Sequence, residues 1–171
     1  MKKLLLLTTV LFFTLSTANA QVEKSTDGNI LEFMFTPNVN GTQTFGLDSG
    51  MFTWRKLDGD SATRWRAAFT FDAEDGYEDF MQLGLYYGKE NHHDGSSRLG
   101  TYTGWEAGFV YEDDGVDDDV AASGGVFAGA NYYIANNLYV GFEARYTLMI
   151  MDGRTMVAPG LNGMLTVGFK L

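Results

Sequence analysis

Strict alternation between apolar and polar side chains constrains this chain more than any other feature, and it is clearest at the C-terminal end. Across the last eleven residues, the odd positions are apolar apart from a glycine: Leu161, Gly163, Leu165, Val167, Phe169 and Leu171. A period of two predicts a β-strand with one apolar and one polar face. Such an apolar terminal strand is stable if it closes a barrel whose outer face meets lipid.

The same alternation recurs along the chain and predicts seven further strands. The expected strands are residues 29–36, 44–57, 62–72, 79–88, 99–112, 122–134, 138–149 and 161–171. Runs of this length fit membrane-spanning strands, which need about 9 to 11 residues. We therefore expect an all-β fold, an eight-stranded antiparallel up-and-down transmembrane β-barrel, in which the last strand pairs with the first around Glu32.

The segments between these strands alternate between tight turns and longer loops, with some exceptions. Asp58-Gly59 and Asn136-Asn137 are typical of tight hairpin turns. Residues 89–97 form a longer polar segment, expected to be a turn, and residues 152–160 are expected to be a loop.

Within the segment 44–57 the alternation changes phase. Phe45, Leu47 and Met51 share one face, which is expected to be the apolar one, whereas Phe52 and Trp54 fall out of step with it. A β-bulge or a position in an aromatic girdle explains such a change, and both interpretations stay open at this point.

The first residues indicate export. Lys2 and Lys3 precede an apolar run, and Ala18-Asn19-Ala20 fits a cleavage site. The expected organisation is a signal peptide at 1–20, a short periplasmic lead at 21–28 and the barrel at 29–171. Because the chain has no Cys, we expect the exported protein to be stable without disulfides.

The charge balance excludes one class of partner. The formal net charge is −10, and removal of Lys2 and Lys3 with the signal leaves −12. Nucleic acid binding needs a basic surface, so nucleic acid is not an expected partner.

The polar faces of the predicted strands carry charges of both signs. These residues are Glu32, Asp48, Arg64, Arg66, Glu106, Glu143, Arg145 and Lys170. The interior of an eight-stranded barrel is only wide enough for its own side chains. We expect these charges to pair in a network that fills the lumen. A soluble barrel with an apolar interior would show the same alternation, but aromatic residues near the strand ends favour the membrane arrangement.

The signal, the eight strands, the hairpin at 132–141 and the terminal segment 165–171 together resemble the OmpA/OmpW-like barrel domain of small outer-membrane proteins, of the kind found in Bacteroidota-type Gram-negative bacteria. The resemblance implies a monomer in the outer membrane, in contact with lipid and lipopolysaccharide. It also implies insertion by the barrel-assembly machinery, with Val167, Phe169 and Leu171 as the assembly signal. Members of this group usually end in an aromatic residue, whereas this chain ends in Leu171.

Two polar segments carry side chains of the types that bind metals or catalyse reactions. In His92-His93-Asp94, adjacent histidines on an extended chain point in opposite directions, and nearby Ser96 and Ser97 lack a third catalytic partner. A solvated turn is expected there. The acidic run 112–119 lacks EF-hand spacing, so a solvated loop is expected, with weak divalent cation binding as the sharper hypothesis.

Four functions follow as hypotheses. The first is a structural, surface-exposed barrel with a filled lumen. The second is a narrow passive pore for small or apolar solutes, as in OmpW-like relatives. The third, an outer-membrane enzyme, has no supporting constellation, and we expect no catalytic, cofactor or metal site. The fourth is a secreted soluble ligand-binding barrel.

Overall fold

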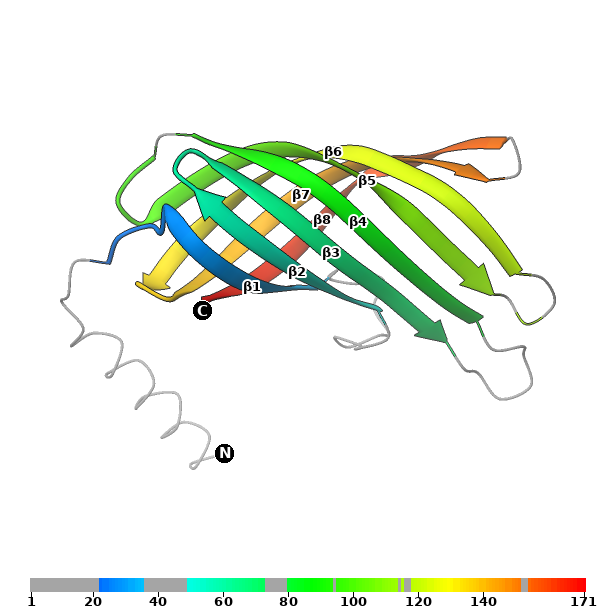
Figure 1. Ribbon diagram of the computed structural model, residues 1–171, viewed down its shortest axis with the longest axis horizontal. Helices are drawn as coiled ribbons and strands as arrows, with labels where there is room; N and C mark the ends of the chain where they lie inside the picture. The colour runs from blue at the N-terminus through cyan, green and yellow to red at the C-terminus, as the bar shows by residue number, and fades with distance from the viewer. Residues whose placement is uncertain are drawn as a thin grey trace, which may run out of the picture.

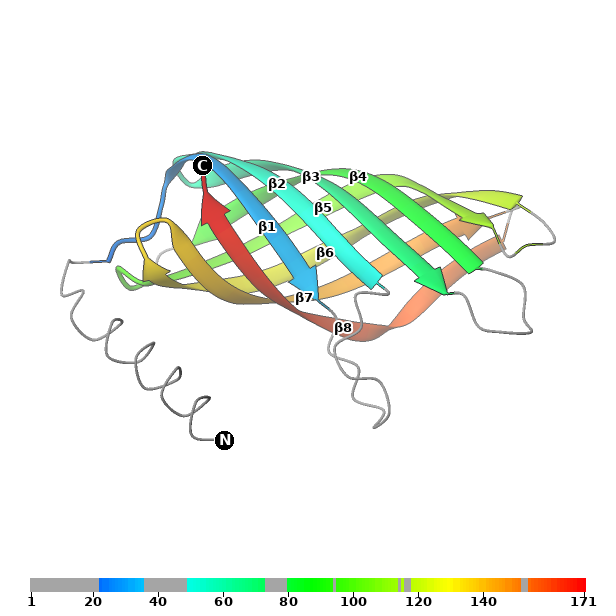
Figure 2. The same ribbon diagram turned by 90° about the horizontal axis from the view of Figure 1, so that it is seen from below.

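The computed structural model describes residues 22–35, 49–72, 80–93, 95–113, 115, 118–151 and 154–171. Over these residues the chain is a closed barrel of eight antiparallel strands in sequence order (Figures 1 and 2). The strands are β1 (Asp27–Phe35), β2 (Ser49–Asp58), β3 (Ser61–Asp72), β4 (Phe80–His93), β5 (Leu99–Asp113), β6 (Asp118–Ala135), β7 (Leu138–Met151) and β8 (Arg154–Lys170). The predicted barrel is confirmed, while the predicted signal peptide at 1–20 lies outside the described residues. No helix in the described part is long and apolar enough to cross a bilayer.

The two faces of the strands differ as the alternation predicts. Phe109 of β5 is 66% exposed on the outside, and Leu85 and Val126 are likewise exposed. Glu106 of β5 and Arg64 of β3 lie on the opposite face of their strands, point inward and are buried. The barrel therefore has an apolar exterior and a charged interior, the reverse of a soluble barrel.

The structure of β2 explains why the apolar alternation changes phase between Met51 and Phe52. Its register is continuous with β1 from Asp27↔Asp58 to Met34↔Met51 and equally continuous with β3, which rules out a bulge over this stretch. Phe52 and Trp54 are exposed on the outside, as girdle positions are. The placement of Met51 on the outer face was wrong, because it alternates with Phe52 and faces the lumen. Phe45 and Leu47 lie outside the described residues.

Two strands continue beyond their predicted ends. Residues 89–93 extend β4 and stay paired with β5 as far as His93↔Thr101, so the predicted turn at 89–97 was wrong over this part. β8 begins at Arg154, inside the loop expected at 152–160. The hydrogen-bonded ladder does not depend on side-chain polarity, so it continues where apolar alternation stops.

The barrel closes between its first and last strands. Glu32 lies opposite Gly168, as expected, and the pairing extends from Ile30↔Lys170 to Phe35↔Leu165. By contrast, β5 and β6 pair over the whole of Leu99–Asp113. The β1–β8 joint is therefore a short ladder in a barrel of otherwise long ones.

Residues 22–26 lie across the end of the barrel that carries the short turns (Figure 1). Their backbone reaches three turns: Glu23 N donates to Asn136 Oδ1 (3.3 Å), Lys24 N donates to Ser97 O (2.6 Å), and Gly59 N donates to Thr26 O (2.9 Å). Val22 is 5% exposed and clusters with apolar residues at this mouth, namely Ile30, Leu57, Ala62, Tyr133 and Tyr139. The expected lead is thus a strap that covers the turn end.

We expect Val22→Asp to release this strap, because a carboxylate is not stable in an apolar cluster. Docking of the strap should weaken by about 1.5–3 kcal/mol, the free energy of burying one such side chain. The barrel itself should stay folded, because the strap can detach from it. Trypsin cleavage after Lys24, followed by mass spectrometry, measures the release. The conservative Glu23→Gln variant should be cleaved at the wild-type rate, and equal cleavage of Val22→Asp would contradict docking of the strap.

Candidate functional site: the charged lumen

The lumen next to the strap is organised by Arg55 of β2, which is 1% exposed. Its Nε donates to Glu90 Oε2 (3.0 Å), and its Nη1 donates to Tyr139 Oη (2.8 Å) and Glu32 Oε2 (3.3 Å). The guanidinium also lies 4.7 Å from the ring centroid of Tyr102. One cation thus joins strands β1, β2, β4, β5 and β7 across the barrel.

Arg64 of β3 forms the next level. Its Nη1 lies 2.8 Å from Glu143 Oε2 and 3.2 Å from Glu90 Oε1, so Glu90 is shared with Arg55. Its guanidinium carbon lies 4.2 Å from the ring centroid of Phe127, where cation–π attraction replaces part of the lost hydration.

Arg66 and Arg145 complete the network on the side away from the strap. Arg66 forms a salt bridge with Glu106, and Arg145 lies 3.3 Å from Glu106 Oε1 and 2.5 Å from Glu143 Oε1. Arg66 also lies 3.7 Å from the ring centroid of Tyr86. Glu90, Glu106 and Glu143 therefore each contact more than one arginine, whereas Glu32 contacts Arg55 and Tyr139.

The completed network contains four carboxylates and four guanidinium groups, all buried: Glu32, Glu90, Glu106, Glu143, Arg55, Arg64, Arg66 and Arg145. Their charges sum to zero. The interior of an eight-stranded barrel is only wide enough for its own side chains. These paired side chains therefore fill the middle of the lumen.

Six of the eight residues predicted for the lumen lie in this network: Glu32, Arg64, Arg66, Glu106, Glu143 and Arg145. Lys170 does not, since its Nζ contacts Asp27 Oδ1 (2.9 Å) at the exposed turn end, where the hydrogen bond and the ammonium charge lower the pKa of Asp27. Asp48 lies outside the described residues.

Sequence reasoning missed Arg55 and Glu90. Arg55 was hidden by the phase change in β2, although counting by twos from Trp54 on the outside would have placed it inside. Glu90 was assigned to a turn, whereas it faces the lumen from the extended end of β4.

Two tyrosines lock the carboxylates in place. Tyr139 donates to Glu32, and Tyr102 donates to Glu143 Oε2 (3.0 Å). Each ring leans over a glycine on the neighbouring strand, Gly168 and Gly129 respectively, where an added Cβ would overlap the ring. Glycine at these two positions provides the space that a filled lumen needs.

His92 and His93 are strand residues, so the prediction of a solvated turn was wrong for them. The two side chains point to opposite sides of the strand, as expected. His92 Nε2 lies 3.1 Å from Glu90 Oε2, and the His92 ring stacks on Tyr102. His93 Nε2 lies 2.9 Å from Thr103 Oγ1. His92 thereby borders the network at its turn end.

The acidic run is described only in part, because residues 114, 116 and 117 lie outside the described set. Glu112 accepts a hydrogen bond from Gln82 Nε2 (2.9 Å), and Asp113 Oδ1 accepts one from Gly115 N (3.0 Å). Among the described residues, no group of three His, Asp or Glu side chains could hold a metal ion. Divalent cation binding by this run stays a prediction.

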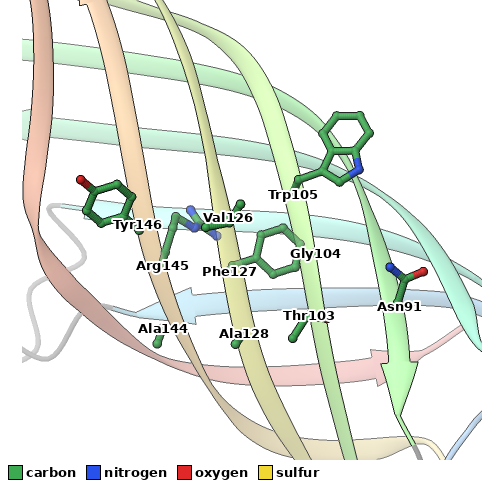
Figure 3. Close-up of a pocket in the computed structure, with 10 residues that line it drawn as sticks. All are labelled: Asn91, Thr103, Gly104, Trp105, Val126, Phe127, Ala128, Ala144, Arg145 and Tyr146. Carbon is green, nitrogen blue, oxygen red and sulfur yellow. The ribbon is translucent and has the colours of Figure 1, made fainter.

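A hollow of about 550 Å³ lies on β4–β7 (Figure 3). The outward side chains Trp105, Val126 and Tyr146 border one side, and the small residues Thr103, Ala128 and Ala144 border the other. Because these side chains alternate with the lumen residues Phe127 and Arg145, the hollow belongs to the exterior of the barrel.

Comparison with known proteins supports the fold. No protein-family model matches the sequence, and no curated protein matches it either. Among solved structures, the chain is similar to the crystal structure of Neisserial surface protein A (NspA), with a TM-score of 0.51 and 17% sequence identity over 84% of this chain and 94% of the other. At this identity the likeness concerns the fold alone.

We expect Glu143→Ala to lower the unfolding temperature in detergent, because it removes the acceptor of Arg64, Arg145 and Tyr102 together. Breaking a buried ion pair on one side costs about 3–5 kcal/mol. Arg66→Ala should act in the same direction by leaving Glu106 with fewer partners. The loss of heat-modifiable gel mobility with rising temperature measures the effect.

The matched control is Asp60→Ala, which removes an exposed carboxylate at the β2–β3 turn and should leave the unfolding temperature unchanged. If both lumen variants unfold at the wild-type temperature, the charges of the lumen are stabilised by water and not by ion pairing.

Proposed function

We propose that this chain is a small integral outer-membrane β-barrel protein with a structural, surface-exposed role and a lumen closed to solutes. In this proposal it is a non-catalytic monomer related to the OmpA/OmpW-like barrels. It is exported through its signal peptide and surrounded by the lipid and lipopolysaccharide of a Gram-negative outer membrane.

The observation that carries the proposal is the inverted distribution of side chains. Large apolar residues such as Phe109, Leu85 and Ile150 are exposed around the barrel, while arginines and glutamates are buried inside it. In water such an exterior would aggregate, whereas in a bilayer it is the stable arrangement. A basic residue on a lipid face costs about 2–4 kcal/mol at the midplane, which explains why the arginines face inward.

The interior supports a closed barrel over a narrow pore. An ion or solute passing through the middle would have to separate Arg55 from Glu90 or Arg64 from Glu143, which leaves buried charges unpaired. The strap at residues 22–26 adds a second obstruction at the turn end. Both features favour the structural role over the pore.

The test uses the full-length protein expressed with its signal. Outer-membrane fractionation and a shift in gel mobility on heating are expected, followed by electrically silent planar bilayers after reconstitution. Recovery in a soluble fraction would overturn the membrane assignment, and discrete conductance steps would replace the closed barrel with the pore.

The terminal segment supports recognition by the barrel-assembly machinery. Phe169 and Leu171 are exposed on the outer face, with Leu171 76% exposed. Phe169 contacts Phe33 of β1 at a ring-centroid distance of 6.5 Å, so its ring belongs to the outside of the closing joint.

We expect Phe169→Ser to reduce the fraction of protein recovered in the outer membrane, because it removes the aromatic group nearest the chain end. Leu171→Phe, which restores the ending usual in the resembled group, should maintain or raise that fraction. Quantitative blotting of membrane fractions measures both. Assembly of Phe169→Ser at the wild-type level would separate this residue from the signal.

A further inference from the structure

Two lysines interrupt the apolar exterior near the turn end of the barrel. Lys56 of β2 pairs with Thr63 of β3, and Thr63 pairs with Lys89 of β4, so the three side chains form one outward-facing row. Both lysines are exposed. Within the described residues neither forms an ion pair, which leaves two positive charges beside one hydroxyl without a counterion.

An aromatic row follows directly on the side towards the middle of the barrel. Trp54, Trp65 and Tyr87 are cross-strand neighbours, with ring centroids 5.1 Å and 5.8 Å apart, and Trp105 lies 6.4 Å from Tyr87. These three tryptophans are all that the chain contains. Amphipathic aromatic side chains of this kind lie in the headgroup and ester region of a membrane interface.

A groove of about 390 Å³ lies beyond the aromatic row. Its floor is at Ala67, and the larger side chains Phe52, Leu85 and Leu31 border it together with Trp54 and Trp65. The small side chain of Ala67 between Phe52 and Leu85 makes the hollow, because the three are cross-strand neighbours on one face.

Along β3 the outward positions are therefore Thr63, Trp65 and Ala67: a polar group between two lysines, an aromatic ring, and the floor of an apolar groove. Successive outward positions are about 7 Å apart. This order of chemistry matches a glycerophospholipid, with its phosphate, its ester region and its acyl chain.

We propose that this surface binds one glycerophospholipid with a net negative headgroup. Its phosphate lies over Thr63 between Lys56 and Lys89, and an acyl chain lies in the groove over Ala67. The proposal rests on the membrane location proposed above.

The geometry allows both lysines to reach one phosphate. Two strand spacings separate them by about 10 Å, and lysine stems lie along apolar surface while the ammonium group extends towards water or a headgroup. Among the strand residues whose side chains are described, Lys56 and Lys89 are the lysines and arginines that face outward. The chain as a whole has a formal net charge of −10. Charge complementarity therefore directs an anionic headgroup to this position rather than to the acidic remainder of the protein.

The three tryptophans make the site its own fluorescent reporter. The full-length protein in detergent micelles is titrated with phosphatidylglycerol or with phosphatidylcholine, both brominated at the same acyl position, and quenching is recorded. For the wild type, half-quenching should need about thirtyfold less phosphatidylglycerol than phosphatidylcholine, as expected for two lysines near an anionic group.

In Lys56→Gln/Lys89→Gln the two lipids should quench equally. The control Lys24→Gln/Lys170→Gln removes the same charge at the barrel mouth and should keep the preference. Heat-modifiable mobility establishes that each variant is folded. Equal quenching of the wild type by both lipids, or an unchanged preference in Lys56→Gln/Lys89→Gln, would overturn the lipid site. Absence of quenching by either lipid would instead overturn the membrane location itself.

Discussion

The structure depends on a single constraint: a barrel of eight strands has an interior that only its own side chains can fill, and here that interior is ionic. Arg55, Arg64, Arg66 and Arg145 are stable there because four glutamates stand within reach of them. Such a network is weak evidence of net stabilisation, since desolvation offsets attraction. Its clearer effect is on register. A slip of β3 by one residue would turn Arg64 and Arg66 towards lipid and Trp65 into the lumen.

Register explains why other features accompany the network. Tyr102 and Tyr139 donate their hydroxyl protons to its carboxylates, and glycines on the adjoining strands make room for their rings. Outside, the same alternation gathers Trp54, Trp65 and Tyr87 into a belt at the turn end. The interior and the exterior therefore both follow from one pattern of strand pairing. A change in strand register alters both faces of the barrel at once.

Much of the fold could be predicted from period-two alternation, because lipid and lumen impose opposite requirements on neighbouring residues. Prediction failed where those requirements relax. Beyond the aromatic belt the outer face of β4 carries polar side chains, so Lys89 and Asn91 resembled a turn and Glu90 was assigned to the same turn. In β2, Met51 is apolar yet faces the lumen, which shifted the assumed phase and concealed Arg55. The buried position of Val22 in the strap depends on three turns distant in sequence, and no local pattern signals such contacts.

The short ladder between β1 and β8 has a consequence for time as well as for space. The joint pairs Ile30–Phe35 with Leu165–Lys170, which lie far apart in the sequence, so the barrel can close only once almost the whole chain is present. Among the described strand pairs this joint is also the shortest ladder, and so it is the line along which the wall would part if the barrel were forced open sideways.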